Sequence, residues 1–170
     1  PRHSAEWLLC DATGLSRVEL YVNFDRPLAP EELDRMHAGI ERRAAGEPLQ
    51  YVTGEMPFRH IVLRCQKGVL IPRPETEVLV DAALEGVDAA ARAAGGPTRV
   101  LEIGTGTGCI SLSVASERPG TRVVATDLSP VAVDLAIRNR EALGLADAVD
   151  IVQTDLAADV DPALMGTFSV

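Results

Sequence analysis

The sequence predicts an α/β fold, a small parallel sheet with helices packed on it, preceded by a compact helical module. In the second half, short apolar runs alternate with helical patterns, and the first two runs, 99–103 and 122–126, each end at or beside an acidic residue. Residues 1 to about 55 instead carry only helix-start and helix-stop signals. The chain has 170 residues and 46% hydrophobic side chains, enough to bury one domain and part of another.

The helical module is predicted to hold three helices. Ser4 and Ser16 are suitable N-caps for the first two, which should stop at Gly14 and near Asn23. Pro30 suits the first turn of a third helix that ends before Gly46. Helical spacing predicts that this third helix buries one face, on which the histidine is interpreted as packed rather than catalytic: Leu33, Met36, His37, Ile40 and Ala44.

A junction follows at 56–77. Two apolar runs, 58–63 and 68–71, predict a β-hairpin with a turn near 66–68. The segment Pro72-Arg73-Pro74 is expected to be extended and stiff, because a residue before proline avoids the helical region. Its charged residues suit one wall of a binding site, and a plain helix entry with a proline stop is the other interpretation: Arg73, Glu75 and Glu77.

The remaining elements follow in a regular order. After a helix at 78–85 and a small-residue stretch at 89–97, we expect strands at 99–103, 122–126 and 149–153 with helices between them. Ser129-Pro130 is an N-cap followed by a first-turn proline, and the helix it starts should bury Ala132, Leu135, Ala136 and Leu143. Residues 168–170 are interpreted as the start of a fourth strand.

A glycine-rich loop joins the first strand of this pattern to its helix. It reads Glu102-Ile103-Gly104-Thr105-Gly106-Thr107-Gly108, and it resembles the S-adenosyl-L-methionine loop of class I (Rossmann-like) methyltransferases. Glycines let the backbone adopt positive φ and approach a ligand closely, and the N-terminus of the following helix favours an anion such as a carboxylate. A dinucleotide loop would need a small third residue where this chain has Cys109. A plain tight turn is the alternative.

Polar residues at the strand ends extend this site. Asp127 can accept hydrogen bonds from both ribose hydroxyls, and Glu102 can face the ammonium group of the cofactor. Asp155 and Leu156 should lie near the adenine, although Asp155 also suits a helix cap or a loop. The predicted cofactor-binding residues are Glu102, Gly104, Thr105, Gly106, Thr107, Gly108, Asp127, Leu128, Asp155 and Leu156.

Composition argues against several classes of protein. The formal net charge of −9 disfavours direct nucleic-acid binding, which needs cations to neutralise phosphates. No apolar run approaches 18 residues and no signal sequence is recognised, so we expect no membrane span and a cytoplasmic location. Cys10, Cys65 and Cys109 form no close pair or histidine cluster, which predicts neither disulfides nor a metal site.

Nearly the whole chain resembles the HemK-like family of peptide chain release factor glutamine-N5 methyltransferases. Four segments carry the resemblance. They are 5–9 (Ala-Glu-Trp-Leu-Leu), 42–54 (Arg-Arg-Ala-Ala-Gly-Glu-Pro-Leu-Gln-Tyr-Val-Thr-Gly), 70–77 (Leu-Ile-Pro-Arg-Pro-Glu-Thr-Glu), and 101–108 with 127–130 in the cofactor domain. The glycine loop alone marks a large superfamily, whereas the Arg-Pro-Glu-Thr-Glu segment and the helical-module signature are much more specific.

The resemblance implies three parts: a helical domain at 1–55 that receives the release factor, a hairpin linker at 56–77, and a methyltransferase domain at 78–170 that uses S-adenosyl-L-methionine. The family carries an Asn-Pro-Pro-Tyr motif after the fourth strand, and residues 1–170 do not contain it. We therefore expect the methyltransferase domain to be partial and the chain truncated at both ends, without catalytic residues of its own and inactive alone. We expect the intact enzyme to be a monomer.

Three other functions stay open at this stage. The first is an N-methyltransferase acting on another protein or on a nucleic-acid base, because such enzymes share the cofactor loop. The second is a nicotinamide-dependent oxidoreductase, which Cys109 argues against. The third is a noncatalytic binding fragment.

Overall fold

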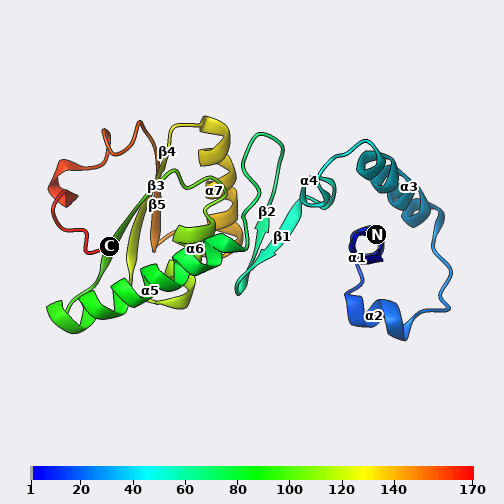
Figure 1. The fold of residues 1–170 in the computed structure, drawn as a ribbon, viewed down its shortest axis with the longest axis horizontal. Helices are drawn as coiled ribbons and strands as arrows, with labels where there is room; N and C mark the ends of the chain where they lie inside the picture. The colour runs from blue at the N-terminus through cyan, green and yellow to red at the C-terminus, as the bar shows by residue number, and fades with distance from the viewer. Residues whose placement is uncertain (1) are drawn as a thin grey trace. The chain divides into compact units, whose positions relative to one another are not determined.

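The computed structural model describes residues 2–170, in which the chain forms two compact units, one up to Glu55 and one of Met56–Val170 (Figure 1). The first unit contains only helices up to its last residue, where a strand begins. The second holds that hairpin, a parallel sheet and the helices that pack on it. Each unit is described by itself below.

The helical unit contains α1 (Arg2–Thr13), α2 (Arg17–Val22), α3 (Pro30–Ala44) and α4 (Leu49–Thr53). The three predicted helices are confirmed and α4 is additional, but the predicted Ser4 cap is wrong, because α1 begins at Arg2 and Ser4 lies within it. Ser16 caps α2 in a reciprocal capping box, in which its hydroxyl accepts from the Glu19 N–H and the Glu19 carboxylate accepts from the Ser16 N–H. Pro30 occupies the first turn of α3, where a missing N–H costs no intrahelical bond.

The predicted buried face of α3 is wrong. Leu33, His37 and Ile40 are exposed, and the buried residues of this helix are Glu32 and Gly39. The cause is close packing: a Cβ built on Gly39 would come within 2.9 Å of Leu8 Cδ2 in α1. The helix turns its smallest residue toward its neighbour, so the contact face is rotated by about one residue from the most apolar one.

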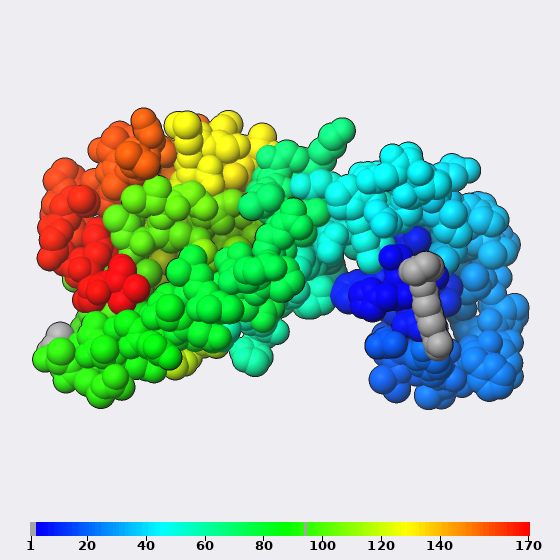
Figure 2. All heavy atoms as spheres, in the orientation of Figure 1, coloured from blue at the N-terminus to red at the C-terminus, as the bar shows by residue number. Residues whose placement is uncertain are grey.

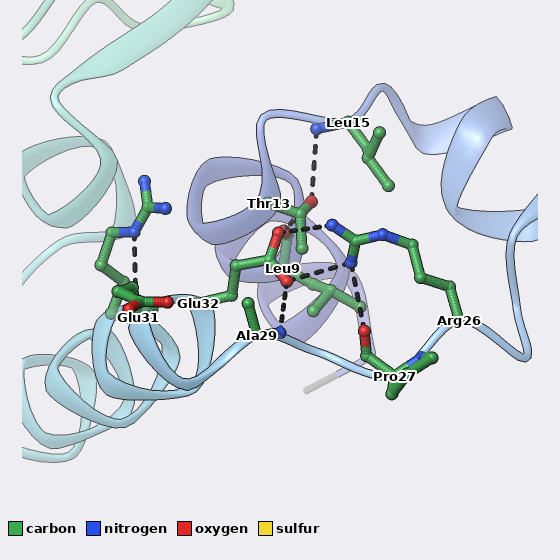
Figure 3. A network of polar contacts seen from close by, with 9 residues as sticks. Leu9, Thr13, Leu15, Arg26, Pro27, Ala29, Glu31 and Glu32 are labelled. Carbon is green, nitrogen blue, oxygen red and sulfur yellow. Dashed lines mark hydrogen bonds and ion pairs between the residues drawn. The ribbon is translucent and has the colours of Figure 1, made fainter.

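Glu32 fixes the entry to α3 (Figure 3). Its Oε2 accepts from the Ala29 N–H at 2.8 Å, and both carboxylate oxygens accept from the Arg26 guanidinium, at 2.6 and 3.0 Å. The Arg26 bonds, followed by the Ala29 N–H, lower the pKa of the Glu32 carboxyl to about 2. The loop before α3 is therefore joined to the helix by an ion pair whose carboxylate is buried and whose guanidinium is 39% exposed.

The short helix α2 buries none of its residues. It is joined to α1 by polar contacts: the Tyr21 hydroxyl donates to Glu6 at 2.8 Å, and Arg17 pairs with the same carboxylate at 2.9 Å. Large apolar side chains of α2 and the residues after it face solvent, with Phe24 84% exposed: Val18, Tyr21, Val22 and Phe24. This unit therefore exposes four large apolar side chains within residues 18–24.

A two-stranded sheet opens the second unit, with β1 (Glu55–Phe58) and β2 (Ile61–Arg64). The predicted hairpin exists, but its predicted strands and turn are displaced. The turn lies at Arg59 and His60, where Arg59 adopts a φ of 49°. Two-residue hairpins require such positive φ and favour glycine or asparagine, neither of which is present here to signal the turn.

Arg59 anchors this turn to the helices of the second unit. Its guanidinium pairs with Glu117 of α6 at 2.7 and 3.0 Å, and with Asp81 of α5 at 2.7 Å. It also donates to the Glu77 carbonyl at 3.1 Å. The side chains of Arg59, in the turn, and Glu117, on α6, are 12% and 14% exposed. The hairpin is therefore held by a nearly buried ion pair.

The main sheet contains β3 (Arg99–Ile103), β4 (Arg122–Asp127) and β5 (Val149–Gln153), all parallel, in the order β3-β4-β5. The helices are α5 (Glu75–Ala94), α6 (Cys109–Glu117) and α7 (Pro130–Ala142), and a short 3₁₀ turn, η1 (Pro162–Leu164), follows the sheet. Right-handed crossovers in one direction place α6 and α7 on the same face (Figure 1). The three predicted strands are confirmed, whereas α5 is longer than the predicted helix at 78–85 and continues to Ala94, within the small-residue stretch at 89–97.

One apolar cluster joins the hairpin, α5, α6 and the sheet, and includes Phe58, Leu63, Val80, Leu112 and Val123. Residues 168–170, the predicted start of a fourth strand, are not assigned to a strand, but they run beside β3. The Leu101 N–H donates to the Val170 carbonyl at 3.0 Å and the Ser169 N–H to the Arg99 carbonyl at 2.9 Å. Val170 also packs on α5, 3.0 Å from where a Cβ of Gly86 would lie. In Figure 2 the C-terminal segment, in red, lies against the green helix α5. The strand order therefore reverses direction at β3, the position where doubly wound sheets bind ligands.

Candidate functional site

The loop between β3 and α6 is held by backbone bonds to the neighbouring strand. The N–H groups of Gly104 and Thr105 both donate to the Thr126 carbonyl, at 2.8 and 2.9 Å. The Gly108 N–H then donates to the Thr105 carbonyl at 2.9 Å, which closes a tight turn. These bonds fix the loop at the carboxyl edge of the sheet before α6 begins.

All three glycines of the loop have positive φ, at 81°, 58° and 83° for Gly104, Gly106 and Gly108. Their surroundings differ. A Cβ on Gly104 would meet no atom within 4 Å, so the loop is open there, whereas a Cβ on Gly108 would lie 2.8 Å from Leu112 Cδ1. Gly104 thus leaves room for a ligand to approach the backbone, and Gly108 allows close packing of the loop on α6.

Asp127 closes the loop from the end of β4. Its Oδ2 accepts from the Gly106 N–H at 2.8 Å, and its Oδ1 accepts from the Ser129 N–H at 2.9 Å. Each oxygen keeps a further lone pair, because a carboxylate can accept about four hydrogen bonds. The carboxylate is half-buried and is held in one orientation by the two amides.

Glu102 lies beneath the loop and is 8% exposed. Its Oε2 accepts from the Thr105 hydroxyl at 2.8 Å and from the Ser111 N–H of α6 at 3.1 Å, while Oε1 has no hydrogen-bond partner among the described residues. Burial raises the pKa of this carboxyl, Thr105 and Ser111 oppose the shift, and the charge of Asp127 adds to it. The bonds support the loop from inside and leave one buried acceptor unused.

Cys109 is the first residue of α6 and lies in the main core cluster. Burial, followed by the nearby Glu102 charge, raises the pKa of its thiol to about 11. The thiol is therefore neutral at physiological pH and packs as a small apolar side chain. The hydroxyl of Thr107 beside it is buried.

Apolar side chains are exposed at the carboxyl ends of all three strands. They are Ile103, the last residue of β3, Leu128 after β4 and Leu156 after β5. Leu156 is 64% exposed and has a φ of 53°. Asp155 is exposed beside it, and the Thr154 N–H joins this turn to the Asp127 carbonyl at 3.0 Å. Large exposed apolar groups around a polar loop are typical of a surface that a ligand covers.

The three charged residues of the junction do not form one cluster. Arg73 and Glu75 are exposed at the start of α5, and the Thr76 N–H donates to the Arg73 carbonyl at 3.0 Å as the helix begins. Glu77 instead faces the hairpin turn, where its carboxylate accepts from the Arg59 N–H at 3.4 Å. The helix entry is confirmed, and the role of Arg73, Glu75 and Glu77 as a site wall stays a prediction.

Two residues that support the loop were not predicted from sequence, Ser111 and Asn139. Ser111 donates its N–H to Glu102, and its hydroxyl lies 3.2 Å from that of Thr105. Asn139 is fully buried on α7 and donates to the Thr107 carbonyl at 2.9 Å. A signal for Asn139 was present, since it occupies a position that helical spacing assigns to the apolar face between Ala136 and Leu143.

Within residues 2–170, no group of three or more histidine, cysteine or acidic side chains could hold a metal ion. The three cysteines of this part of the chain form no disulfide. None of the helices that the structure describes is long and apolar enough to span a membrane.

Two protein-family models match the sequence. The PrmC N-terminal domain matches residues 1–54, and the methyltransferase small domain matches residues 84–166. The first match covers the helical unit, and the second covers most of α5, the glycine loop, the sheet and the segment after it.

Curated relatives match over most of the chain, and each is named release factor glutamine methyltransferase. The protein of Chlorobaculum tepidum is 39% identical over 100% of this chain and 58% of its own length. Those of Geobacter sulfurreducens and Escherichia coli are 46% and 40% identical, over 84% and 91% of this chain and 48% and 53% of their own lengths. The chain therefore spans about half the length of the relatives it matches.

Among solved structures, the N-terminal domain of human METTL16 in complex with SAH is similar to part of this chain. It is 22% identical, with a TM-score of 0.45, over 54% of this chain and 36% of that one.

Proposed function

The chain belongs to the release factor glutamine methyltransferase family, and from this premise we propose that it supplies two parts of such an enzyme. These are the S-adenosyl-L-methionine site and the helical domain that receives a peptide chain release factor. The reaction is N5-methylation of a glutamine side chain, a step that serves translation termination. The observation that carries the proposal is the Asp127 carboxylate held on the Gly106 N–H, because it places an acid and an open glycine loop at one sheet edge.

The residues present fit this cofactor. The open backbone at Gly104 and the N-terminus of α6 suit the carboxylate of its methionine moiety. The free lone pairs of Asp127 suit two ribose hydroxyls. The unpartnered Oε1 of Glu102 lies beneath the same loop, which supports a role near the ammonium group.

Apolar groups complete the site. Leu128, which follows β4, and Leu156, after β5, are both exposed, and they suit the two faces of an adenine ring. Asp155, exposed beside Leu156, is placed to accept from the exocyclic amine of that ring. Burial of these leucines by the cofactor would remove the largest apolar exposure at the carboxyl edge.

The cofactor supplies a methyl group already activated on a sulfonium, so the protein mainly has to position the acceptor. The loop and Asp127 hold one partner at the edge where the strand order reverses. Arg73 and Glu75, exposed at the start of α5, are proposed to form a wall of the acceptor pocket. Glu77 is the weaker candidate, since its carboxylate contacts the hairpin turn.

We also propose that the release factor binds the helical unit through α2 and the residues after it. This segment exposes Val18, Val22 and Phe24, and none of the residues of α2 is buried. Exposed apolar patches on small domains mark protein–protein contacts. The proposed enzyme is a cytoplasmic monomer, in keeping with a soluble substrate that works in translation.

Competing functions receive less support. A nicotinamide-dependent oxidoreductase needs a small third loop residue, and the Cys109 side chain is packed in the core at that position. Methylation of a nucleic-acid base would require a cationic surface, and the net charge of −9 argues against one.

Calorimetric titration with S-adenosylhomocysteine tests the cofactor site. We expect saturable binding by the wild-type chain, much weaker binding by Asp127→Ala, and no heat with NADH. Asp134→Ala, on an exposed position of α7, is the matched acidic control and should bind normally. Equal affinity of wild type and Asp127→Ala would refute the assignment of that carboxylate.

Immobilised peptide chain release factor tests the second part. We expect Val22→Asp and Phe24→Asp to abolish capture of the chain while S-adenosylhomocysteine affinity stays unchanged. Asp34→Asn, at an exposed polar position of α3, should leave capture intact. Undiminished capture of both apolar variants would contradict the assignment of this surface.

A further inference from the structure

Asn139 is a polar residue in the apolar face of α7. It is 1% exposed, and the residues one turn before it, Leu135 and Ala136, are buried in the core. A buried amide is unfavourable unless its hydrogen bonds are made, so the partners of this side chain indicate what it does.

The side chain joins two segments that are far apart in sequence. Its Nδ2 donates to the Thr107 carbonyl at 2.9 Å and to the Arg64 carbonyl at 3.2 Å, and its Oδ1 accepts from the Arg64 N–H at 2.8 Å. Thr107 lies between two glycines of the loop, and Arg64 is the last residue of β2. One side chain therefore bridges the glycine loop and the end of the hairpin.

The segment after β2 continues along α7 toward the same loop. Arg138 of α7 donates to the Gln66 side chain at 2.6 Å, and Val69 packs in a cluster with Ala132 and Leu135. A Cβ on Gly106 would lie 3.9 Å from Val69 Cγ1. The loop and the 64–69 segment thus rest on one face of α7, with Asn139 as a shared hydrogen-bond partner.

We infer that Asn139 is a positioning residue for the cofactor site, a role that rests on the proposed function. It acts through the Thr107 carbonyl, which follows Gly106, the residue whose N–H orients the Asp127 carboxylate. Because Asn139 also bonds the Arg64 backbone, it fixes the position of the loop relative to the segment that leads to Pro72 and Arg73. Loss of the Nδ2 bonds frees the loop without emptying the space that the side chain fills.

Two near-isosteric variants separate the bonds. Asn139→Asp keeps an acceptor for the Arg64 N–H and loses both donors, and Asn139→Leu loses all three bonds. Val87→Ala is the control for general loss of stability, because Val87 is buried on α5 beside Thr98, at the amino edge of the sheet. Residue-resolved amide hydrogen exchange on the ligand-free chain is the readout.

We expect Asn139→Asp to speed exchange at Gly106 and Gly108 roughly tenfold and to leave Arg64 protected, since one hydrogen bond to a neutral group is lost there. Asn139→Leu should speed exchange at all three amides, and Val87→Ala should change none of them selectively. S-adenosylhomocysteine affinity should fall roughly tenfold in both Asn139 variants and stay near wild type in the control.

The two proposals fail in different ways. A wild-type chain that does not bind S-adenosylhomocysteine contradicts the proposed function, while the exchange pattern still decides whether Asn139 orders the loop. Unchanged protection of Gly106 and Gly108 in folded Asn139→Asp overturns the inference, as does wild-type S-adenosylhomocysteine affinity in that variant. If Asn139→Leu does not fold by circular dichroism, Asn139→Asp alone carries the test.

Discussion

The two units of this chain place polar and apolar residues in opposite ways. In the helical unit, Val22 and Phe24 face solvent while an acid, Glu32, is buried. In the sheet unit, Phe58, Leu63 and Leu112 lie in a large apolar core, and several buried polar residues support the glycine loop: Glu102, Thr105, Thr107, Ser111 and Asn139.

The difference fits the two functions proposed for these units. A loop that must approach a ligand closely depends on a few exact backbone positions, and the buried polar groups hold them. A surface that receives a protein depends on exposed apolar area, which needs little internal precision. We therefore expect small substitutions in the glycine loop to destabilise the chain. The helical unit should tolerate substitutions except at the Arg26–Glu32 ion pair.

The largest effect is expected at Gly108. Gly108→Ala places a Cβ 2.8 Å from buried Leu112 at a φ of 83°, and should destabilise the chain by about 2–4 kcal/mol through overpacking and backbone strain. Gly104→Ala has a similar φ with no atom within 4 Å, and should lose only about 1–2 kcal/mol. Urea unfolding measures both, and equal losses would show that steric fit at the loop is unimportant.

The hairpin anchor should come next. Arg59→Ala removes a nearly buried guanidinium and leaves the Glu117 carboxylate without it, with an expected loss of about 1.5–3 kcal/mol. Arg118→Ala is the matched control, because its pair with Asp88 is more than a third exposed and should give no measurable loss. Urea unfolding of both variants decides the point, and a larger loss in Arg118→Ala would contradict it.

Glu102 should produce a smaller, pH-dependent effect. Burial raises the pKa of its carboxyl above the usual 4.5, so the folded state favours the protonated acid. Its ionisation therefore lowers stability as the pH rises above 4.5. We expect Glu102→Gln to reduce the fall in melting temperature as the pH rises above 4.5, and to unfold at a higher temperature than wild type once wild-type Glu102 is ionised. A parallel pair of curves would contradict this assignment.

The sequence predicted much of the sheet unit because its signals are local. Strand positions, the Ser129 cap and the glycine loop all follow from neighbouring residues. The buried face of α3 and the turn at Arg59 were wrong because they depend on partners distant in sequence: Leu8 decides which side of α3 is buried, and Glu117 and Asp81 hold the turn. Asn139 was missed for the same reason, since its partners lie 32 and 75 residues away.

The smallest expected effect tests the helical unit alone. Bonds from Arg26 and Ala29 lower the Glu32 pKa to about 2, below its usual 4.5. The stabilisation is complete above pH 4.5 and is lost as the pH falls toward about 2, where the folded state must also take up the proton. Trp7, the single tryptophan, lies on α1 of this unit, so its fluorescence reports unfolding there.

The control is Glu32→Gln, which can still accept from the Ala29 N–H but carries no charge for Arg26. His3 accepts a hydrogen bond from the Trp7 indole at 3.1 Å, and because both proteins contain this contact, the comparison between them isolates the effect of residue 32. We expect the urea midpoint of wild type to fall between pH 4.5 and 2.5 and that of Glu32→Gln to change less. The two midpoints should converge at the acid end, because protonated Glu32 and glutamine are both neutral. Parallel curves would mean that the Arg26–Glu32 pair contributes nothing, and that the helical unit is held by apolar contacts after all.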